Sequence, residues 1–368
     1  MFVWVLTGIY GKKMPIRNSR EQFEKFANTI KMTQSLLLQA FQGKNKRVPV
    51  WFMRQAGRYL PQYRALKRKF SLQEMFQQPE LAAYITCLPV DILGVDAAIL
   101  FADILTLPSQ MGFKITFAPQ NGPLIQNPIK SARDVDKVHD FTNLKHVEQI
   151  IKVVNHQLPT NIPLIGFAGA PFTVLTYLIE GSSQQQFTKT LSFIYTQPLA
   201  FHRCMKILTK NTIDYLNLQK RAGIQVFQLF DTWGGILGPE EYKQLILPYV
   251  KKVFREVNLP SIYYLKNAVH LLECINETKA DFLSVCQVIS IGNDLAKKVK
   301  LGIQGNLFNG LLYADNTTLA KEVDGLLKRA HVHKKYIFNL SHGVFPDVAV
   351  EKLKFVVNRV HRSGWRPS

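Results

Sequence analysis

Short apolar runs recur along the whole chain, and each one ends at a turn or loop signal. They are rich in Val, Ile, Leu and Phe and stay apolar throughout, rather than alternating apolar with polar residues. Such runs are typical of strands that are buried on both faces, as in a parallel sheet. The predicted strands are residues 48–53, 97–102, 163–167, 224–230, 261–265, 281–285, 301–304 and 336–340.

Amphipathic stretches lie between these runs and predict helices. One of them opens with the sequence GPEEY, which puts Pro at the first helical position and two carboxylates in the first turn. Eight alternations of strand and helix over about 300 residues predict an α/β fold, a single (β/α)8 TIM barrel. The alternative is an open doubly wound sheet, but no GxGxxG loop follows the first strand. The clearest predicted helices are residues 144–158, 198–220, 239–258 and 316–330.

The composition is that of a folded protein with a large basic surplus. The 368 residues are 47% hydrophobic and 20% charged, and 46 Lys and Arg against 26 Asp and Glu give a formal net charge of +20. Such a surplus suits polyanionic partners, and nucleic acid is the first to consider. The basic residues are scattered, however, and no basic stripe alternates with aromatic residues. We therefore predict no nucleic-acid partner, and we assign the charge to solubility and one concentrated anion site.

Cysteine spacing and hydropathy predict neither a metal site nor a membrane span. Cys87, Cys204, Cys274 and Cys286 share no CxxC or CxC spacing, which is typical of separate reduced thiols. His270 and Cys274 could be neighbours on a helix, but a pair without a third ligand is weak support for a metal. No apolar run reaches the length of a membrane-spanning helix.

Residues 1–30 are predicted to be an extension in front of the barrel. They begin with an apolar stretch that is followed, not preceded, by basic residues, so they make a poor complete signal peptide. One interpretation is the remnant of a leader into an organelle, of the plastid type. The alternative is a non-native start upstream of Met14 in a cytoplasmic protein.

Polar side chains follow several predicted strands at the same end. Arg54 and Arg58 leave the first run, Asp103 follows the second, Thr232 the fourth and His342 the eighth. In a (β/α)8 barrel the carboxyl ends of the strands meet on one rim, which carries the active site. Burying two unpaired guanidinium groups would cost several kcal/mol each, so the arginines must meet water, acidic side chains or an acidic ligand. A structural ion-pair cluster is the alternative.

Six sequence blocks resemble the uroporphyrinogen decarboxylase family. The resemblance covers most of the chain, from about residue 47 to residue 360. It implies that residues 31–368 form one barrel, that the chain is a homodimer, and that it is a carboxy-lyase. The implied reaction needs no cofactor and removes the four acetate carboxyl groups of uroporphyrinogen III, a tetrapyrrole, to give coproporphyrinogen III and CO2 in haem biosynthesis. The blocks are MRQAGRYLPQYR, FADILTLPSQMG, GFAGAPFTVLTYLIEG, QLFDTWGG, GIQGNL and FNLSHGVFPD.

The resemblance also implies which residues act on the substrate. Asp103 would accept hydrogen bonds from the pyrrole N–H groups and stabilise the cation that forms when a ring carbon is protonated. Arg54 and Arg58 would grip substrate carboxylates with their planar guanidinium groups. These three are the expected catalytic residues. The expected substrate-contacting residues are Arg54, Gln55, Ala56, Gly57, Arg58, Tyr63, Asp103, Phe167, Tyr177, Thr232 and His342.

The chain departs from the family pattern at several positions. Thr232 stands where Ser is usual, and Lys67 stands where Arg is common. Phe308 and Asn309 replace the Asp-Pro of the family's GNLDP, and residues 285–287 read VCQ where the family has LDW. The last two departures predict weaker support for the loops on that side of the barrel.

Other interpretations of the same residues stay open. A zinc-dependent, corrinoid-linked methyltransferase has a similar barrel, but it would need a His-x-Cys…Cys site, and His270 and Cys274 have the wrong spacing. A tetrapyrrole binder that has lost turnover would keep the same contacts. Taken singly, Asp103 could cap the next helix, and Tyr177 and His342 could be ordinary structural residues.

Overall fold

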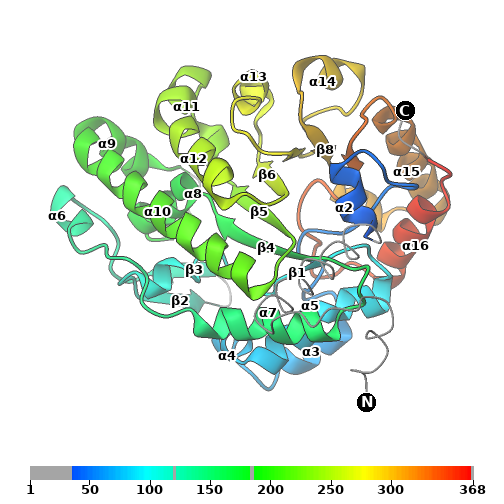
Figure 1. Cartoon of the computed structure of the whole chain (residues 1–368), viewed down its shortest axis with the longest axis horizontal. Coiled ribbons are helices and arrows are strands. Elements are labelled where there is room, and N and C mark those ends of the chain that lie inside the picture. Colours follow the sequence, from blue (N-terminus) through cyan, green and yellow to red (C-terminus); the bar gives the residue numbers. More distant parts are fainter. Residues whose placement is uncertain (1–34, 119–121, 183–185, 366–368) are drawn as a thin grey trace, which may run out of the picture.

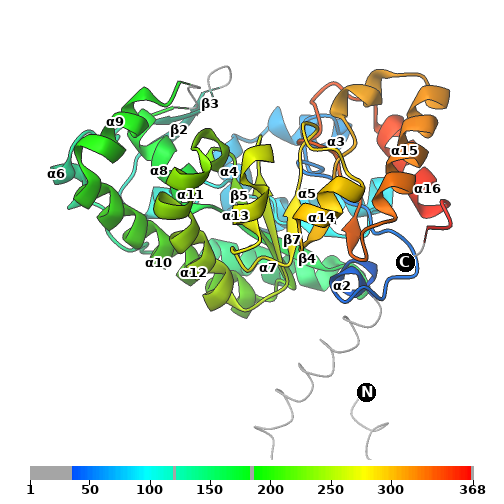
Figure 2. The same cartoon turned by 90° about the horizontal axis from the view of Figure 1, so that it is seen from above.

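A parallel sheet forms the centre of the molecule, and helices surround it (Figures 1 and 2). The computed structural model describes residues 35–118, 122–182 and 186–365, so the predicted extension over residues 1–30 lies outside the described residues. Within them, seven strands pair in the order β1-β4-β5-β6-β7-β8-β9, and every pairing is parallel. The strands are β1 Ala98–Ile99, β4 Leu164–Gly169, β5 Val226–Asp231, β6 Ser261–Leu265, β7 Phe282–Ser284, β8 Gly302–Gln304 and β9 Tyr336–Ile337.

An eighth position closes this sheet into a barrel between β9 and β1. On the β9 side, the Phe338 amide donates to the Pro49 carbonyl at 2.9 Å, and the Trp51 amide donates to the Phe338 carbonyl at 3.4 Å. On the β1 side, the Asp96 amide donates to the Val50 carbonyl at 2.8 Å. The segment around Val50 thus bonds to both neighbours, and the predicted (β/α)8 barrel is confirmed.

The predicted strands differ from the observed ones mainly at the first run. Each of the other seven predicted runs overlaps one strand of the sheet. The run over residues 48–53 is reduced to a single parallel bridge between Val50 and Phe338. The chain leaves the sheet soon afterwards, because the Met53 amide donates to the Asn339 side chain at 3.1 Å instead of to a neighbouring strand.

Helices cover the outside of the barrel, and successive helices contact one another around it, as α5 contacts α7, α7 contacts α10 and α16 contacts α5. The helices are α2 Leu36–Phe41, α3 Pro61–Lys67, α4 Leu72–Gln77, α5 Pro79–Leu93, α6 Ala132–Val135, α7 Lys145–Gln157, α8 Pro171–Glu180, α9 Thr188–Thr196, α10 Pro198–Ala222, α11 Pro239–Leu245, α12 Leu247–Val257, α13 Leu272–Ile275, α14 Asn293–Lys298, α15 Asn316–Ala330 and α16 Val350–His361. Short 3-10 helices are η1 Pro108–Gln110, η2 Gly234–Ile236, η3 Val269–Leu271 and η4 Asn309–Tyr313.

Three of the four clearest predicted helices coincide with α7, α10 and α15 to within two residues at each end. The predicted helix over residues 239–258 is instead two helices, α11 and α12. Pro248 lies in the first turn of α12, where it has no amide hydrogen to continue the hydrogen-bond ladder of α11. The prolyl break was therefore visible in the sequence.

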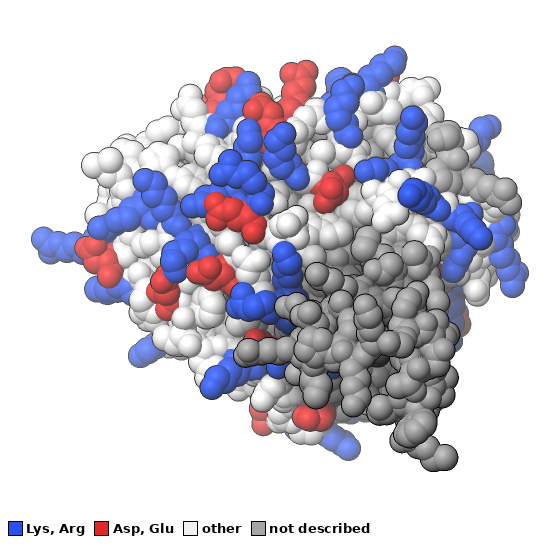
Figure 3. Space-filling model, viewed as in Figure 1, with Lys and Arg blue, Asp and Glu red and all other residues white. Residues whose placement is uncertain are grey.

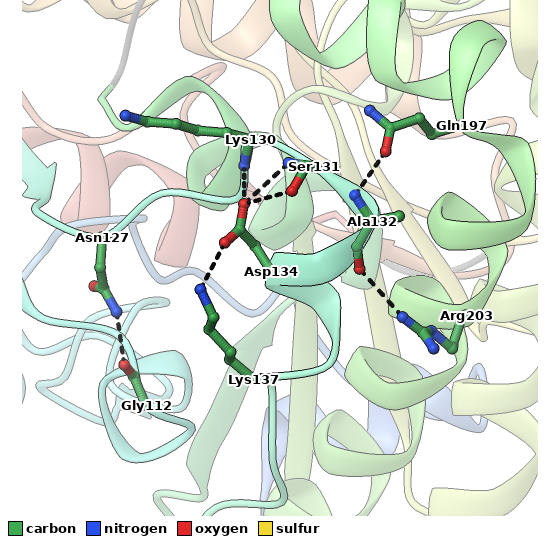
Figure 4. Close-up of polar contacts among 9 residues, drawn as sticks. All are labelled: Gly112, Asn127, Lys130, Ser131, Ala132, Asp134, Lys137, Gln197 and Arg203. Carbon is green, nitrogen blue, oxygen red and sulfur yellow. Dashed lines mark hydrogen bonds and ion pairs between the residues drawn. The ribbon is translucent and has the colours of Figure 1, made fainter.

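A hairpin outside the barrel was not predicted. It pairs β2 Ile115–Ala118 with β3 Gly122–Ile125 in antiparallel register. The segment after it is held by the Asp134 carboxylate, which accepts bonds from the amides of Lys130 and Ser131 and from the Lys137 ammonium (Figure 4). These bonds, that of Lys137 foremost, lower the pKa of Asp134 to about 2. Asp134 therefore fixes the outer segment at the start of α6.

The interior of the barrel carries a connected set of buried amides. The Gln304 side chain accepts from the Trp51 indole at 3.0 Å and donates to Gln228 at 3.0 Å and to Ser284 at 2.9 Å. The Gln228 amide in turn points at the Met53 sulfur at 3.6 Å. Because buried polar groups are costly when unpaired, this network favours one arrangement of the strands beneath the rim.

Candidate active site

Arg54 stands at the carboxyl end of the first barrel segment in an unusual backbone conformation. Its φ is +58°, which side chains rarely adopt and which clusters at functional sites. A Cβ on Gly57 would lie 2.8 Å from the Arg54 carbonyl oxygen, so the turn requires a glycine there. Both Arg54 and Arg58 are exposed. The turn therefore presents two guanidinium groups at the rim, as the sequence predicted.

Gln55 points the other way, into the protein. Its side chain is fully buried, accepts from the Phe52 amide at 3.0 Å and donates to the Ala97 carbonyl at 2.9 Å. The Tyr59 hydroxyl donates to the Gln55 carbonyl at 2.7 Å. The structure thus uses Gln55 to brace the arginine turn, while Ala56 and Gly57 remain half-buried at the surface of that turn.

Asp103 follows β1, and in the described part of the chain one of its two carboxylate oxygens is hydrogen-bonded. One carboxylate oxygen, Oδ1, accepts from the Leu105 amide at 2.8 Å. Among the residues that the structure describes, Oδ2 has no hydrogen-bond partner. Burial raises the pKa of Asp103, while the Leu105 amide and the Arg54 guanidinium oppose the rise. The site therefore contains a desolvated carboxylate with one oxygen available.

Three of the predicted residues, Asp103, Tyr177 and His342, lie within electrostatic reach of Arg54. Burial raises the pKa of Asp103 and of Tyr177 and the Arg54 charge opposes that rise, whereas for His342 the same charge adds to a fall in the pKa. For His342, burial is the larger cause, and together with Arg54 and Lys266 it lowers the pKa to about 4. His342 is consequently a neutral imidazole near pH 7, able to donate one hydrogen bond and accept another.

Lys266 was missed by the sequence analysis. It comes directly after β6, is half-buried, and places its ammonium 5.9 Å from the centre of the Trp233 ring. Trp233 in turn packs against Tyr177 with ring centroids 6.1 Å apart. The signal was present, since Lys266 is a cation at the end of a predicted strand, but none of the six family blocks includes it.

Three cations of the site have no acidic partner. Within the described part of the chain, neither Arg54, Arg58 nor Lys266 forms an ion pair. Elsewhere on the molecule basic and acidic side chains are interspersed, as the face in Figure 3 shows. The unpaired cations therefore make the rim suited to a ligand that carries several carboxylates.

Thr232 is positioned by a buried network beneath it. The Asp231 carboxylate, which is fully buried, accepts from the Thr173 hydroxyl at 2.6 Å and from the Tyr263 hydroxyl at 2.7 Å. The Thr173 hydroxyl also accepts from the Trp233 amide at 3.0 Å. Burial raises the pKa of Asp231, against these bonds. The network fixes the backbone on both sides of Thr232, whose side chain is half-buried.

Aromatic rings line the barrel end beside these polar groups. Phe167 lies edge-on to Phe230, with centroids 5.5 Å apart, and Phe230 packs against Tyr264 at 5.7 Å. Tyr63 packs edge-on against Phe101 at 5.8 Å. The Tyr264 hydroxyl is buried without a hydrogen-bond partner in the described residues, and the Arg54 charge acts on its pKa. Tyr264 is thus a second residue that the sequence analysis missed.

At both departures from the family pattern the substituted residues make hydrogen bonds to neighbouring loops. Cys286 accepts from the Asn267 amide at 3.4 Å, so the loop after β7 is tied to the loop after β6. Asn309 is 1% exposed and hydrogen-bonds to the loop that carries His342. Both substituted residues provide contacts of their own.

The described residues contain neither a cluster of metal ligands nor a membrane-spanning helix. In residues 35–118, 122–182 and 186–365 no group of three or more His, Cys, Asp or Glu side chains could hold a metal ion. The same residues contain no helix that is long and apolar enough to cross a membrane. All four cysteines are buried thiols that form no disulfide bond.

Comparison with known proteins identifies the family. A family model described as uroporphyrinogen decarboxylase (URO-D) matches residues 32–363. A uroporphyrinogen decarboxylase of Trichlorobacter lovleyi is 40% identical over 329 residues, which cover 87% of this chain and 96% of the relative. One of Thermodesulfovibrio yellowstonii is 42% identical over 318 residues, 85% of this chain and 93% of the relative. The chain belongs to the uroporphyrinogen decarboxylase family. The predicted family and its enzyme class, a carboxy-lyase, are confirmed.

Similar solved structures agree on the fold. A methyltransferase from Methanosarcina mazei superposes with a TM-score of 0.72 at 18% identity, over 89% of this chain and 98% of that one. A putative vitamin-B12-independent methionine synthase from Listeria monocytogenes gives a TM-score of 0.56 at 13% identity, over 86% of this chain and 96% of that one. At such identities the likeness concerns the fold and does not favour methyl transfer over decarboxylation.

Proposed function

We propose that this chain converts uroporphyrinogen III to coproporphyrinogen III by removing its four acetate carboxyl groups at the carboxyl end of the barrel. The observation that carries the proposal is the Asp103 carboxylate, which is desolvated, lies near Arg54 and keeps one oxygen without a partner among the described residues. That oxygen is available to accept pyrrole N–H groups. Membership of the family supplies the substrate class.

The chemistry requires a place for the electrons that remain when CO2 leaves. Protonation of the ring carbon beside the acetate-bearing carbon turns the pyrrole into a cationic iminium, which accepts those electrons. A preorganised carboxylate in a site of low dielectric stabilises this cation more strongly than water can. Asp103 fits that role, because burial raises its pKa and a cationic ligand would offset the cost of its charge.

The unpaired cations would bind the carboxylates around the macrocycle. Arg54 and Arg58 can each make a bidentate contact with an acetate or propionate group. Lys266, whose ammonium lies 5.9 Å from the centre of the Trp233 ring, adds a third positive charge. Neutral His342 and Tyr177 can donate single hydrogen bonds to further carboxylates, and Phe167 and Tyr63 supply apolar surface for the rings.

Turnover of anaerobically prepared uroporphyrinogen, followed by chromatography of the oxidised products, tests the proposal. We expect products that carry progressively fewer carboxyl groups, ending at four. The variant Lys266→Met removes the charge and keeps much of the apolar stem, so we expect a raised KM and little change in kcat. Binding of substrate with no product in a single turnover would show the alternative, a tetrapyrrole binder without activity.

We also propose that the chain works as a homodimer. Several exposed apolar side chains stand on the loops that follow β6, β7, β8 and β9, on the same rim as the site: Val269, Val288, Phe308, Tyr313 and Phe345. Apolar side chains gathered in this way are typical of a surface that another chain covers. Light scattering of the purified protein should give about twice the chain mass of 42.1 kDa. A single-chain mass at micromolar concentration would contradict the proposal.

The compartment stays a prediction. The organelle leader would lie in residues 1–30, outside the described residues, and the relatives reported above are bacterial. Cell fractionation together with sequencing of the mature N-terminus would distinguish an imported protein from a cytoplasmic one.

A further inference from the structure

The loop that carries His342 is held by one buried side chain from a different part of the barrel. Asn309 opens η4, after β8, and is 1% exposed. Its Nδ2 donates to the carbonyls of His342 at 3.1 Å and Gly343 at 2.9 Å. Its Oδ1 accepts from the Ser341 hydroxyl at 2.9 Å and from the His342 amide at 3.0 Å. A side-chain amide has two donor hydrogens and two acceptor lone pairs, so residues 341–343 satisfy every hydrogen-bonding group of the Asn309 side chain.

The same loop also supports Arg54. An added Cβ on Gly343 would lie 2.3 Å from Cδ of Arg54 and 2.6 Å from its Cγ, so the arginine stem lies directly across the glycine backbone. The Val344 amide donates to the Met53 carbonyl at 2.9 Å, which ties the loop to the residue before Arg54. Displacing the loop would therefore displace both a hydrogen-bond donor and a cation of the site.

From this geometry we infer that Asn309 is a positioning residue for substrate binding, which sets the places of His342 and Arg54 at once through the loop 341–343. The inference rests on the proposed binding roles of those two residues. Asn309 does not itself face the substrate, since its side chain is buried and all its hydrogen bonds are internal. Its position is one where the family pattern has Pro, which offers no side-chain amide, so this form of support belongs to this chain.

The test compares Asn309→Ala with a matched control, Asn211→Ala. Asn211 is also fully buried and makes three hydrogen bonds, to Phe141, Asp140 and Ile207, but it lies on α10, away from the rim residues. Both variants should lower the melting temperature. Asn309→Ala alone should raise KM for uroporphyrinogen, by about tenfold, which corresponds to the weakening of one carboxylate contact. An unchanged KM in folded Asn309→Ala, or an equal rise in Asn211→Ala, would overturn the inference.

A second, more conservative variant guards against misfolding. Combining it with substitutions of the site residues tests whether Asn309 acts through them. Asn309→Ser leaves a small neutral group that can donate one hydrogen bond and accept another, so it should fold even if the alanine variant does not. Its effect on KM should largely disappear in an Arg54→Lys, His342→Ala background, where both substrate contacts are already weakened. Independent effects that multiply would show that Asn309 acts elsewhere. If the wild-type protein itself gives no product, the proposed function fails first, and that result is separate from these outcomes.

Discussion

Replacing Asp103 by Asn tests the centre of the proposed chemistry with the smallest change in shape. The variant can keep the bond that Oδ1 accepts from the Leu105 amide, so the local turn should survive. It replaces the unpartnered oxygen by an amide that carries no charge and cannot offset a pyrrolic cation. Removing one preorganised group that stabilises transition-state charge typically costs ~10²–10³ in kcat, about 3–4 kcal/mol. Because a full charge is lost here, we expect kcat to fall by at least ~10³.

The thermal stability of Asp103→Asn should rise or stay unchanged, although its kcat falls. Burial raises the pKa of Asp103, so the folded state binds its proton more tightly than the unfolded state does. The stability that this carboxyl contributes is present at acidic pH and is lost as pH rises through the raised pKa. At pH 7.5 the uncharged Asn avoids that loss, and the melting temperature should stay within about 4 °C of the wild type or rise.

The assay is anaerobic turnover with chromatography of the oxidised products, together with a thermal melt of each variant. Asp281→Asn is a suitable control, because that carboxylate stands just before β7, at the opposite end of the barrel, and bonds to the Ser261 amide and hydroxyl at 2.9 Å each. The control should lose stability and keep kcat. Turnover near the wild-type rate in Asp103→Asn would refute the role of the charge. A variant that fails to fold would show that Asp103 is chiefly the cap of the following turn.

The remaining predictions concern the cations, His342 and the buried network. Arg58→Lys should raise KM and lower kcat, because an ammonium cannot reproduce the planar grip; equal activity would reduce Arg58 to a simple charge. Rising salt should raise KM and leave kcat almost unchanged, and duplex DNA should not inhibit; a salt-independent KM would show that apolar contacts dominate binding. The depressed pKa of His342 means that stability should fall as pH drops from about 6.5 toward 4, and His342→Gln should flatten that part of a melting-temperature profile. Asp231→Asn should lower the melting temperature by roughly 3–5 °C, because an amide can accept only one of the two hydroxyl bonds and the lost bond to a charge is worth about 2–4 kcal/mol with the unpaired donor.

The barrel could be predicted because strands that are buried on both faces have short, continuous apolar sequences. The hydropathy pattern did not predict the β2–β3 hairpin, whose strands show no clear alternation of apolar and polar residues. It predicted a full strand over residues 48–53, where the structure has only the bridge at Val50. The division of the predicted helix 239–258 could have been foreseen from Pro248, whose missing amide hydrogen was overlooked. Element boundaries were thus predictable where a single residue sets them, and less predictable where they depend on pairing with a distant segment.

The site followed the same rule. Residues at strand ends, such as Arg54 and Asp103, could be found because the barrel topology alone brings them to one rim. Gln55 lies between two site residues in sequence, yet its side chain turns inward, which only the packing of the turn against Ala97 reveals. The sequence does not reveal the hydrogen bonds of Asn309, because its partners are 32 to 34 residues further along the chain and meet it only across adjacent barrel positions.

The charge pattern of the rim explains why a site of this kind needs its buried supports. Arg54 and Lys266 both lower the pKa of His342, and neither forms an ion pair among the described residues, so the two cations repel each other until an anionic ligand arrives. Repulsion of that kind would spread flexible side chains apart. It is opposed by backbone contacts that do not depend on charge: the amide of Asn309 on the His342 loop, the close contact of Arg54 with Gly343, and the inward brace of Gln55. These contacts hold the cations in place, and we expect substrate carboxylates to relieve the repulsion on binding, which would favour a polyanion over a neutral ring system of the same size.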